Sequence, residues 1–221
     1  MAKIHKSPED MMWDAYNQFH FHCDTRRFQK LVARVEMARM IADIPGDIVD
    51  AGAFKGVSTL QFAQMLEIYQ PNSRAKVISL DTFEATFPQI RNDEKKGDSD
   101  LMRDYQAGSY ERLTEAIQRL GLAHRVTILR GDVAETLPQY IADNPGFRIA
   151  LLHCDLDAEG PTRNTLNAAW PRIVKGGMVV FDEYAIENWG ESEAADSFFS
   201  GILSTAVNLG MFIATIYIIK L

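Results

Sequence analysis

The chain has few cysteines, fewer basic than acidic residues, and no long apolar run near its N-terminus. Its two cysteines, Cys23 and Cys154, exclude a disulfide framework and favour a reducing cytoplasm as the location of the protein. The 30 acidic and 23 basic residues give a net charge of −7. This charge excludes broad nucleic-acid binding, because such binding needs a basic surface that displaces counterions.

The short apolar runs also limit the ways in which the chain could meet a membrane. The first residues contain no long apolar stretch, so we expect no signal peptide. The run MFIATIYII at 211–219 is too short to cross a bilayer as a helix and is typical of a strand. With 47% hydrophobic and 24% charged residues, the composition predicts one globular domain over 1–221 with a substantial core.

Residues 1–45 predict a helical N-terminal extension. Ser7 is a typical helix cap, and Pro8 suits the first helical position. A second helix is predicted by apolar residues at helical spacing, namely Phe28, Leu31, Val32 and Val35.

The remainder of the chain alternates between strand-like and helix-like segments. Strands are predicted at 47–50, 76–80, 125–129, 148–153 and 178–181, and helices at 58–65, 113–120 and 162–170. This alternation predicts an α/β fold, a doubly wound and mostly parallel Rossmann-like sheet with helices on both faces. The segment 88–109 is polar and interrupted by glycines, and we expect a lid loop over 85–110.

Each predicted strand ends on an acid or leads into one. These acids are Asp50, Asp81, Asp132, Asp155 and Asp182. In an open α/β sheet, ligands bind outside the carboxyl ends of the strands. We therefore expect the acids to share one edge of the sheet and to mark the functional site.

The turn after the first strand indicates the kind of ligand. Gly52 and Gly56 remove side-chain bulk just before a helix N-terminus, which suits a ligand that approaches the backbone. A dinucleotide fingerprint would need a third glycine, and Asp50 before the turn would repel a pyrophosphate. Asp81 has the usual position for binding ribose hydroxyls. Together these features favour S-adenosylmethionine, with a ligand-free strand-to-helix connection as the alternative interpretation of the turn alone.

At this point the sequence resembles a known family. DIVDAGAFKGVSTL resembles the cofactor loop of class I S-adenosylmethionine-dependent methyltransferases. Three further segments resemble the macrocin O-methyltransferase-like group, which methylates sugar hydroxyls: LDTFEATFP, LLHCDLDAEGPT and GGMVVFDEYAIENWGESEAADSFF. The similar segments extend over roughly residues 28–200 in the same order, which is more specific than a single motif.

The resemblance implies a Mg²⁺-dependent O-methyltransferase that acts on a sugar, a glycoside or another hydroxylated small molecule. It also implies a homo-oligomer, since many relatives are dimers or larger, and neither nucleic acid nor membrane is an expected partner. The chain departs from the family pattern at Ala85, Glu159 and Glu183, which surround the expected acceptor site. These departures leave the identity of the acceptor open.

The candidate site has two parts. The cofactor pocket is expected to contain Asp50, Ala51, Gly52, Ala53, Gly56, Ser58, Asp81, Thr82, Gly131 and Asp132. A second part comprises Asp155, Asp182 and Glu183, whose mutual repulsion calls for a cation or a shared proton. Oxygen ligands suit Mg²⁺ or Ca²⁺. The resemblance implies that these three acids bind magnesium and that Asp155 is also the general base.

Several alternatives accompany this hypothesis. Asp182 could cap a turn while Glu183 faces solvent. His20, His22 and Cys23 suggest zinc, but positions two apart do not share a helix face and zinc needs three or four ligands. His153 shares the face of Asp155 and is expected to be a core histidine.

Two further functions stay open. One is a noncatalytic S-adenosylmethionine-binding protein. The other is a nicotinamide-dependent oxidoreductase, which the missing third glycine disfavours.

Overall fold

The structure is a computed structural model that describes residues 7–84, 106–185, 190–202, 205–211 and 216–221. Within these residues, seven strands form one sheet in the order β3-β2-β1-β4-β5-β7-β6. The strands are β1 (Asp47–Ala51), β2 (Val77–Asp81), β3 (Val126–Arg130), β4 (Ile149–Cys154), β5 (Ile173–Phe181), β6 (Val207–Asn208) and β7 (Ile216–Ile219). Strands β1 to β5 pair in parallel, and β7 runs antiparallel to β5 and β6. The predicted mostly parallel sheet is confirmed.

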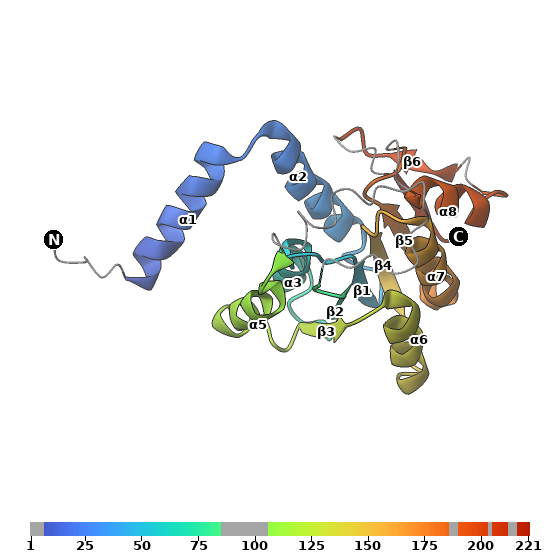
Figure 1. Ribbon diagram of the computed structural model, residues 1–221, viewed down its shortest axis with the longest axis horizontal. Helices are drawn as coiled ribbons and strands as arrows, with labels where there is room; N and C mark the ends of the chain where they lie inside the picture. Colours follow the sequence, from blue (N-terminus) through green and yellow to red (C-terminus); the bar gives the residue numbers. More distant parts are fainter. Residues whose placement is uncertain (1–6, 85–105, 186–189, 203–204, 212–215) are drawn as a thin grey trace.

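Helices cover both faces of this sheet (Figure 1). The helices of the described residues are α1 (Pro8–His22), which does not pack on the sheet, and α2 (Thr25–Met40), α3 (Val57–Tyr69), α5 (Ser109–Arg119), α6 (Val133–Asp143), α7 (Glu159–Ala169) and α8 (Glu191–Phe198), with a short 3₁₀ turn, η1 (Trp170–Arg172). One apolar cluster joins α2, α3 and α5 to the sheet, and a second joins α6, α7 and α8 to it. Ile48 belongs to the first cluster and its neighbour Val49 to the second, because successive strand residues point to opposite faces.

The predicted strands are confirmed to within a few residues, except that β5 begins at Ile173 rather than Met178. The predicted strand began directly after Gly176 and Gly177. Instead, the strand passes through Gly176 and Gly177 with a shift in its register against β4. A Cβ at Gly177 would lie 2.9 Å from the carbonyl oxygen of Ala150. The glycines therefore allow a local irregularity inside the strand.

The predicted N-terminal helices are also confirmed. Ser7 caps α1 in a capping box with Asp10, and no residue of α1 is buried. Figure 1 shows α1 extending away from the sheet, while α2 packs against α3. The most buried apolar residues of α2 are Ala33, Met37 and Ala38, so its buried face is rotated from the predicted stripe.

The order of the strands places a crevice beside β1. After β1, the chain adds β2 and β3 on one side and then returns to add β4 on the other side. The loops that follow β1 and β4 therefore diverge at their carboxyl ends, where open α/β sheets bind ligands. Most of the lid predicted over 85–110 lies outside the described residues, which resume at Gln106.

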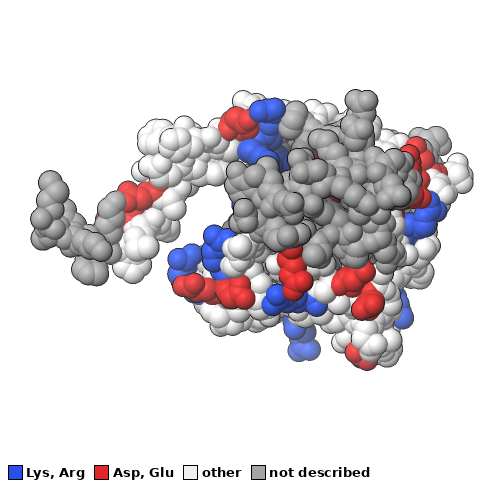
Figure 2. Space-filling model, in the orientation of Figure 1, with Lys and Arg blue, Asp and Glu red and all other residues white. Residues whose placement is uncertain are grey.

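The described surface mixes charges of both signs, and its helices are unsuited to crossing a membrane. On the face shown in Figure 2, acidic and basic side chains of the described residues are interspersed. Among the described residues, no helix combines the length and the apolar character that crossing a bilayer requires.

Candidate cofactor and carboxylate site

A cavity of about 760 Å³ lies at the carboxyl ends of β1, β2 and β4. Eight of the predicted site residues line it: Gly52, Ala53, Ser58, Asp81, Thr82, Gly131, Asp155 and Glu183. The other five do not line it: Asp50, Ala51, Gly56, Asp132 and Asp182. One cavity thus connects the glycine loop with part of the predicted carboxylate cluster.

The two glycines of the loop make room for other parts of the protein. Gly52 has φ +90°, and a Cβ there would lie 1.8 Å from the carbonyl oxygen of Asp155. Gly56 has φ +80°, and its Cβ would lie 2.5 Å from a methyl group of Leu113. The loop after β1 therefore touches the backbone of the loop after β4. This contact joins the two halves of the predicted site.

The side chain of Asp50 points into the protein interior, so Asp50 supports the glycine loop from below and does not line the cavity. Its carboxylate is fully buried and accepts hydrogen bonds from Ser58 Oγ at 2.8 Å, Thr59 Oγ1 at 2.6 Å and His153 Nδ1 at 2.9 Å. Burial raises the pKa of Asp50, but these hydrogen bonds and the charge of His153 outweigh burial and hold the pKa below its usual value. The structure thus gives Asp50 a supporting position, in place of the expected direct contact with a ligand.

Asp81 lies at the end of β2 and does line the cavity. Its carboxylate accepts hydrogen bonds from the backbone N–H of Phe54 at 2.8 Å and of Phe83 at 2.6 Å, and from the Gln106 amide at 2.7 Å. Burial raises the pKa of Asp81, and the hydrogen bonds oppose that rise only in part. Asp81 thereby holds the glycine loop and also contributes to the wall of the cavity.

Gly131 and Asp132 follow β3 and have different positions. Gly131 lines the cavity, whereas the Asp132 carboxylate accepts a hydrogen bond from the Ala134 N–H at 2.8 Å. Asp132 is the N-cap of α6, a helix for which the sequence analysis named no bounds.

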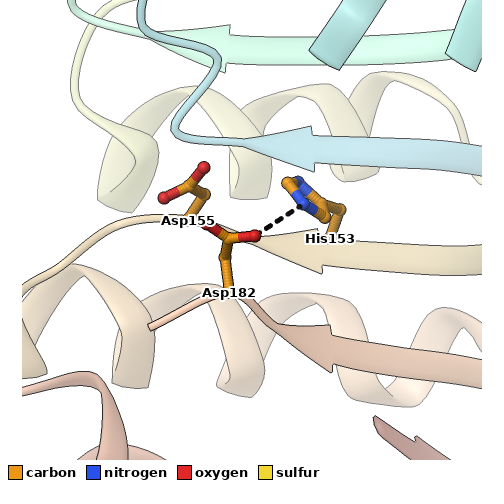
Figure 3. A group of neighbouring side chains, drawn as sticks. All are labelled: His153, Asp155 and Asp182. Atoms are coloured by element: carbon orange, nitrogen blue, oxygen red, sulfur yellow. Dashed lines mark ion pairs between the residues drawn. The ribbon is translucent and has the colours of Figure 1, made fainter. Parts of the chain in front are cut away.

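The predicted trio of carboxylates is divided into two groups that share Asp155. Ligand atoms of His153, Asp155 and Asp182 lie within 4.8 Å of one another, and so do those of Asp155, Asp157 and Glu183. Figure 3 shows the first group, with His153 on β4 and Asp182 at the end of β5 facing each other beside Asp155. In the described part of the chain, His20, His22 and Cys23 form no such group.

Lys30 of α2 reaches this cluster from the other side of the cavity. Its ammonium donates a hydrogen bond to Asp182 Oδ2 and lies 3.8 Å from Glu183 Oε1. Burial tends to lower the pKa of Lys30. The negative charges of Asp155, Asp182 and Glu183 outweigh burial, so the pKa of Lys30 is raised above its ordinary value. The cluster therefore includes one protein cation that the sequence analysis did not identify.

The single ammonium does not balance the acids around it. Burial and the charge of Asp182 raise the pKa of Asp155 to about 6. Burial and the charge of Asp155 raise the pKa of Glu183 to about 7. Burial and Asp155 also raise the pKa of Asp157 well above its usual range. Asp182 is the exception, since Lys30 and His153 overcome the effect of burial and lower its pKa. The cluster thus has room for further positive charge.

A fully buried glutamate, Glu191, connects the loops that carry these acids. It lies at the start of α8, and its carboxyl group accepts hydrogen bonds from the Glu183 N–H at 2.9 Å and the Leu156 N–H at 3.4 Å. Burial and the neighbouring Asp155 raise its pKa well above the usual range. Glu191 therefore holds the ends of β4 and β5 together beneath the cavity.

Four residues around the site were missed in the sequence or assigned a different role there. Lys30 and Arg34 lie on a cavity-facing side of α2, and their spacing of four residues was the available signal. Glu191 gave no local signal, because its partners come from two other loops. His153 was expected to be a core histidine with satisfied ring nitrogens, but the structure leaves its Nε2 without a partner among the described residues.

Comparisons with known proteins agree with the fold and the site. The model of the macrocin O-methyltransferase (TylF) family matches residues 11–200. Mycinamicin III 3''-O-methyltransferase of Micromonospora griseorubida is 28% identical over 174 residues, which are 76% of this chain and 66% of the relative. A Streptomyces olivaceus 4'-O-methyltransferase that acts on a rhamnosyl-tetracenomycin C is 29% identical over 154 residues, which are 67% of this chain and 57% of the relative.

Solved structures show the same relationship. The calicheamicin methyltransferase CalS11 superposes with a TM-score of 0.83 at 26% identity, covering 98% of this chain and 94% of the other. The chain spans about two thirds or less of the curated relatives that it matches. Because the family model matches most of its length, the chain belongs to the macrocin O-methyltransferase (TylF) family.

Proposed function

We propose that this protein is an S-adenosylmethionine-dependent O-methyltransferase that acts on a hydroxyl of a sugar, a glycoside or a related small molecule. One observation carries the proposal: a single cavity is lined both by the glycine loop and by the acid at the end of β4. A methyl donor held by the loop and a hydroxyl held beside the acid would then share one space. Proximity of this kind supplies a large part of the acceleration in such transfers.

The cofactor would lie along the loops after β1, β2 and β3. Asp81 would accept hydrogen bonds from the ribose hydroxyls, with Thr82 and Gly131 beside it, since all three line the cavity. The backbone of Gly52 and Ala53 would face the amino-acid end of the cofactor. S-adenosylmethionine supplies an electrophilic methyl group on a sulfonium.

Asp155 is the residue that we expect to accept the proton of the acceptor hydroxyl. It lines the cavity and, with a pKa of about 6, is mostly ionised at neutral pH while remaining a better base than an ordinary aspartate. Glu183 and Asp157 lie beside it and also line the cavity. These side chains would orient the hydroxyl toward the methyl donor.

The residues around Asp155 fit a divalent cation such as Mg²⁺. The raised pKa values of Asp155 and Glu183 indicate acids short of positive charge, and the unpartnered His153 Nε2 indicates a further donor atom. Asp155, Asp182 and Glu183 would hold the ion, with Asp155 shared between the two groups. When bound, the ion supplies positive charge beside a hydroxyl that loses its proton.

The names of the relatives support the proposed acceptor class. One is the O-methyltransferase for mycinamicin III, another acts on a rhamnosyl-tetracenomycin C, and CalS11 in its apo structure is a TDP-rhamnose 3'-O-methyltransferase. We expect a sugar or glycoside acceptor here as well. We also expect a cytoplasmic homo-oligomer.

Methyl transfer from S-adenosylmethionine to a panel of glycosides and nucleotide-linked sugars, with and without EDTA, tests the proposal. We expect product with at least one acceptor and loss of turnover with EDTA. S-adenosylmethionine should raise the melting temperature of the protein, and NAD should not. Cofactor binding without turnover on any acceptor would favour a noncatalytic binding protein, and a shift with NAD alone would favour an oxidoreductase.

A further inference from the structure

His153 has an unusual arrangement of its two ring nitrogens. The side chain is fully buried, and Nδ1 lies 2.9 Å from Asp50 Oδ1. Nε2 is buried as well, but it has no hydrogen-bond partner among the described residues. Asp182 Oδ1 lies 3.9 Å from it. A buried polar atom without a partner is rare and calls for an explanation.

Asp50 determines which nitrogen is available. The Ser58 and Thr59 hydroxyls donate hydrogen bonds to Asp50 Oδ2, while Oδ1 of the same carboxylate faces Nδ1, so Nδ1 is the nitrogen that donates a proton to Asp50. In the neutral imidazole, the lone pair then lies on Nε2, which faces the carboxylates. The ring is also held by an edge-to-face contact with Phe62, at 5.3 Å between centroids. A histidine that binds a metal commonly donates its other N–H to a carboxylate in this way.

The space in front of Nε2 fits a shared ion. Two atoms that each lie about 2.1 Å from one ion are at most about 4.2 Å apart, and Nε2 and Asp182 Oδ1 are 3.9 Å apart. Lys30 binds the other oxygen of Asp182, Oδ2, so its ammonium leaves Oδ1 facing the imidazole. Asp155 completes the group on the side of the cavity.

We propose that His153 Nε2 is a nitrogen ligand of the divalent cation, together with Asp155 and Asp182, so that the site prefers Mn²⁺ or Co²⁺ to Mg²⁺. This proposal rests on the metal binding included in the proposed function. Oxygen donors suit Mg²⁺, whereas an imidazole donor favours first-row transition ions. In this assignment His153 takes the place of Glu183 in the ligand set of the proposed function, and Glu183 and Asp157, which form the second group around Asp155, remain available to the acceptor.

Pulsed EPR of the whole protein with Mn²⁺ as the only divalent ion tests the assignment. We expect electron spin echo modulation from a directly bound ¹⁴N, replaced by a ¹⁵N coupling when histidine is ¹⁵N-labelled. This measurement needs no variant, so a folding defect cannot affect it. Bound Mn²⁺ without a nitrogen coupling would overturn the proposal and leave the metal part of the proposed function standing.

Calorimetric titration with Mn²⁺ and Mg²⁺ adds an affinity comparison. We expect wild type to bind Mn²⁺ about tenfold or more tightly than Mg²⁺, and His153→Gln to lose most of that preference. His124→Gln is the matched control, because His124 is exposed and contacts Glu67 away from the cluster. Equal losses for both ions in His153→Gln would indicate a purely structural histidine and would overturn the proposal. Absence of any divalent binding in wild type would overturn both this inference and the metal part of the proposed function, while methyl transfer in EDTA would preserve the transferase assignment.

Discussion

At the glycine-loop end of the cavity, Asp50 and Asp81 accept hydrogen bonds through both of their oxygens, from side chains and from backbone N–H groups. At the other end, Asp155, Asp157 and Glu183 are acids whose pKa values stay raised although Lys30 contacts the cluster and Arg27 and Arg34 also act on it. The first end is organised by the protein itself. The second is organised with a deficit of positive charge, as expected for a place that receives a cation and a proton.

The comparison also identifies what joins the two ends. Gly52 packs against the backbone of Asp155, and the Asp50–His153 pair runs beneath the loop toward Asp182. These contacts are routes by which a change at one end can reach the other. Substitutions chosen outside these contacts should separate cofactor binding from chemistry.

The largest effect is expected from Asp155→Asn. The variant keeps its shape but loses the charge that accepts the proton, so turnover should fall about 10²-fold or more. Affinity for S-adenosylmethionine should stay within about threefold, because the loop end retains its hydrogen bonds. Steady-state kinetics and calorimetry measure the two quantities. The exposed Asp143→Asn on α6 is the control, and near wild-type turnover in Asp155→Asn would make the cluster structural.

Asp81→Ala should have the next largest effect, on binding. Loss of its carboxylate removes the expected ribose contact and frees the Phe54 N–H, so affinity for S-adenosylmethionine should fall about ten- to a hundredfold. Asp132→Ala is the comparison variant, since Asp132 caps α6 and does not line the cavity. We expect it to cost about 1 kcal/mol of stability with little change in affinity. Unchanged affinity in Asp81→Ala would remove Asp81 from the cofactor site.

Glu191→Ala should affect the carboxylate end alone. Two backbone donors, of Glu183 and Leu156, would lose their acceptor, which costs about 1–3 kcal/mol of stability. Turnover should decrease about tenfold while cofactor affinity is kept, because the loops that carry Asp155 and Glu183 lose their common anchor. Glu191→Gln retains an acceptor oxygen and should recover most of the turnover. Equal defects in the two variants would show that the charge, rather than the hydrogen bonds, matters.

The smallest effect concerns stability as a function of pH in the absence of divalent ions. Asp155 and Glu183 have folded-state pKa values of about 6 and about 7, above their ordinary values. Between about pH 4 and pH 7, the folded state therefore holds more protons than the unfolded one, and the free energy of unfolding should decrease as the pH rises. Asp50 and Asp182, with lowered pKa values, contribute in the opposite direction only at lower pH.

Thermal unfolding in EDTA from pH 5 to pH 7.5 measures this slope. Saturating Mn²⁺ or Mg²⁺ should flatten or reverse it, because a bound cation favours the ionised acids. A melting temperature that rises with pH in EDTA would contradict the charge deficit at the carboxylate end.

Much of the fold and part of the site could be predicted from local patterns in the sequence. Short apolar runs that alternate with helical periodicity favour a parallel sheet, because the helices that connect parallel strands cover both faces and bury the strands between them. The acids that follow these runs then meet at one edge, which placed Asp81 and Asp155 in the cavity. No local pattern in the sequence shows that β7 pairs antiparallel with β5 or that β5 continues through two glycines. Both features depend on pairing between strands that are distant in the chain.

The tertiary structure decided the roles of individual side chains within that edge. Asp50 and Asp182 also end strands, yet neither lines the cavity, because the direction of each side chain depends on the twist and packing of the sheet. Lys30 lies 152 residues from Asp182 in the chain, and their contact arises only once α2 packs against the sheet. The sequence by itself therefore determined which acids could meet, because strand ends are local features. Which of them face the ligand, and which cation stands among them, was decided by long-range packing.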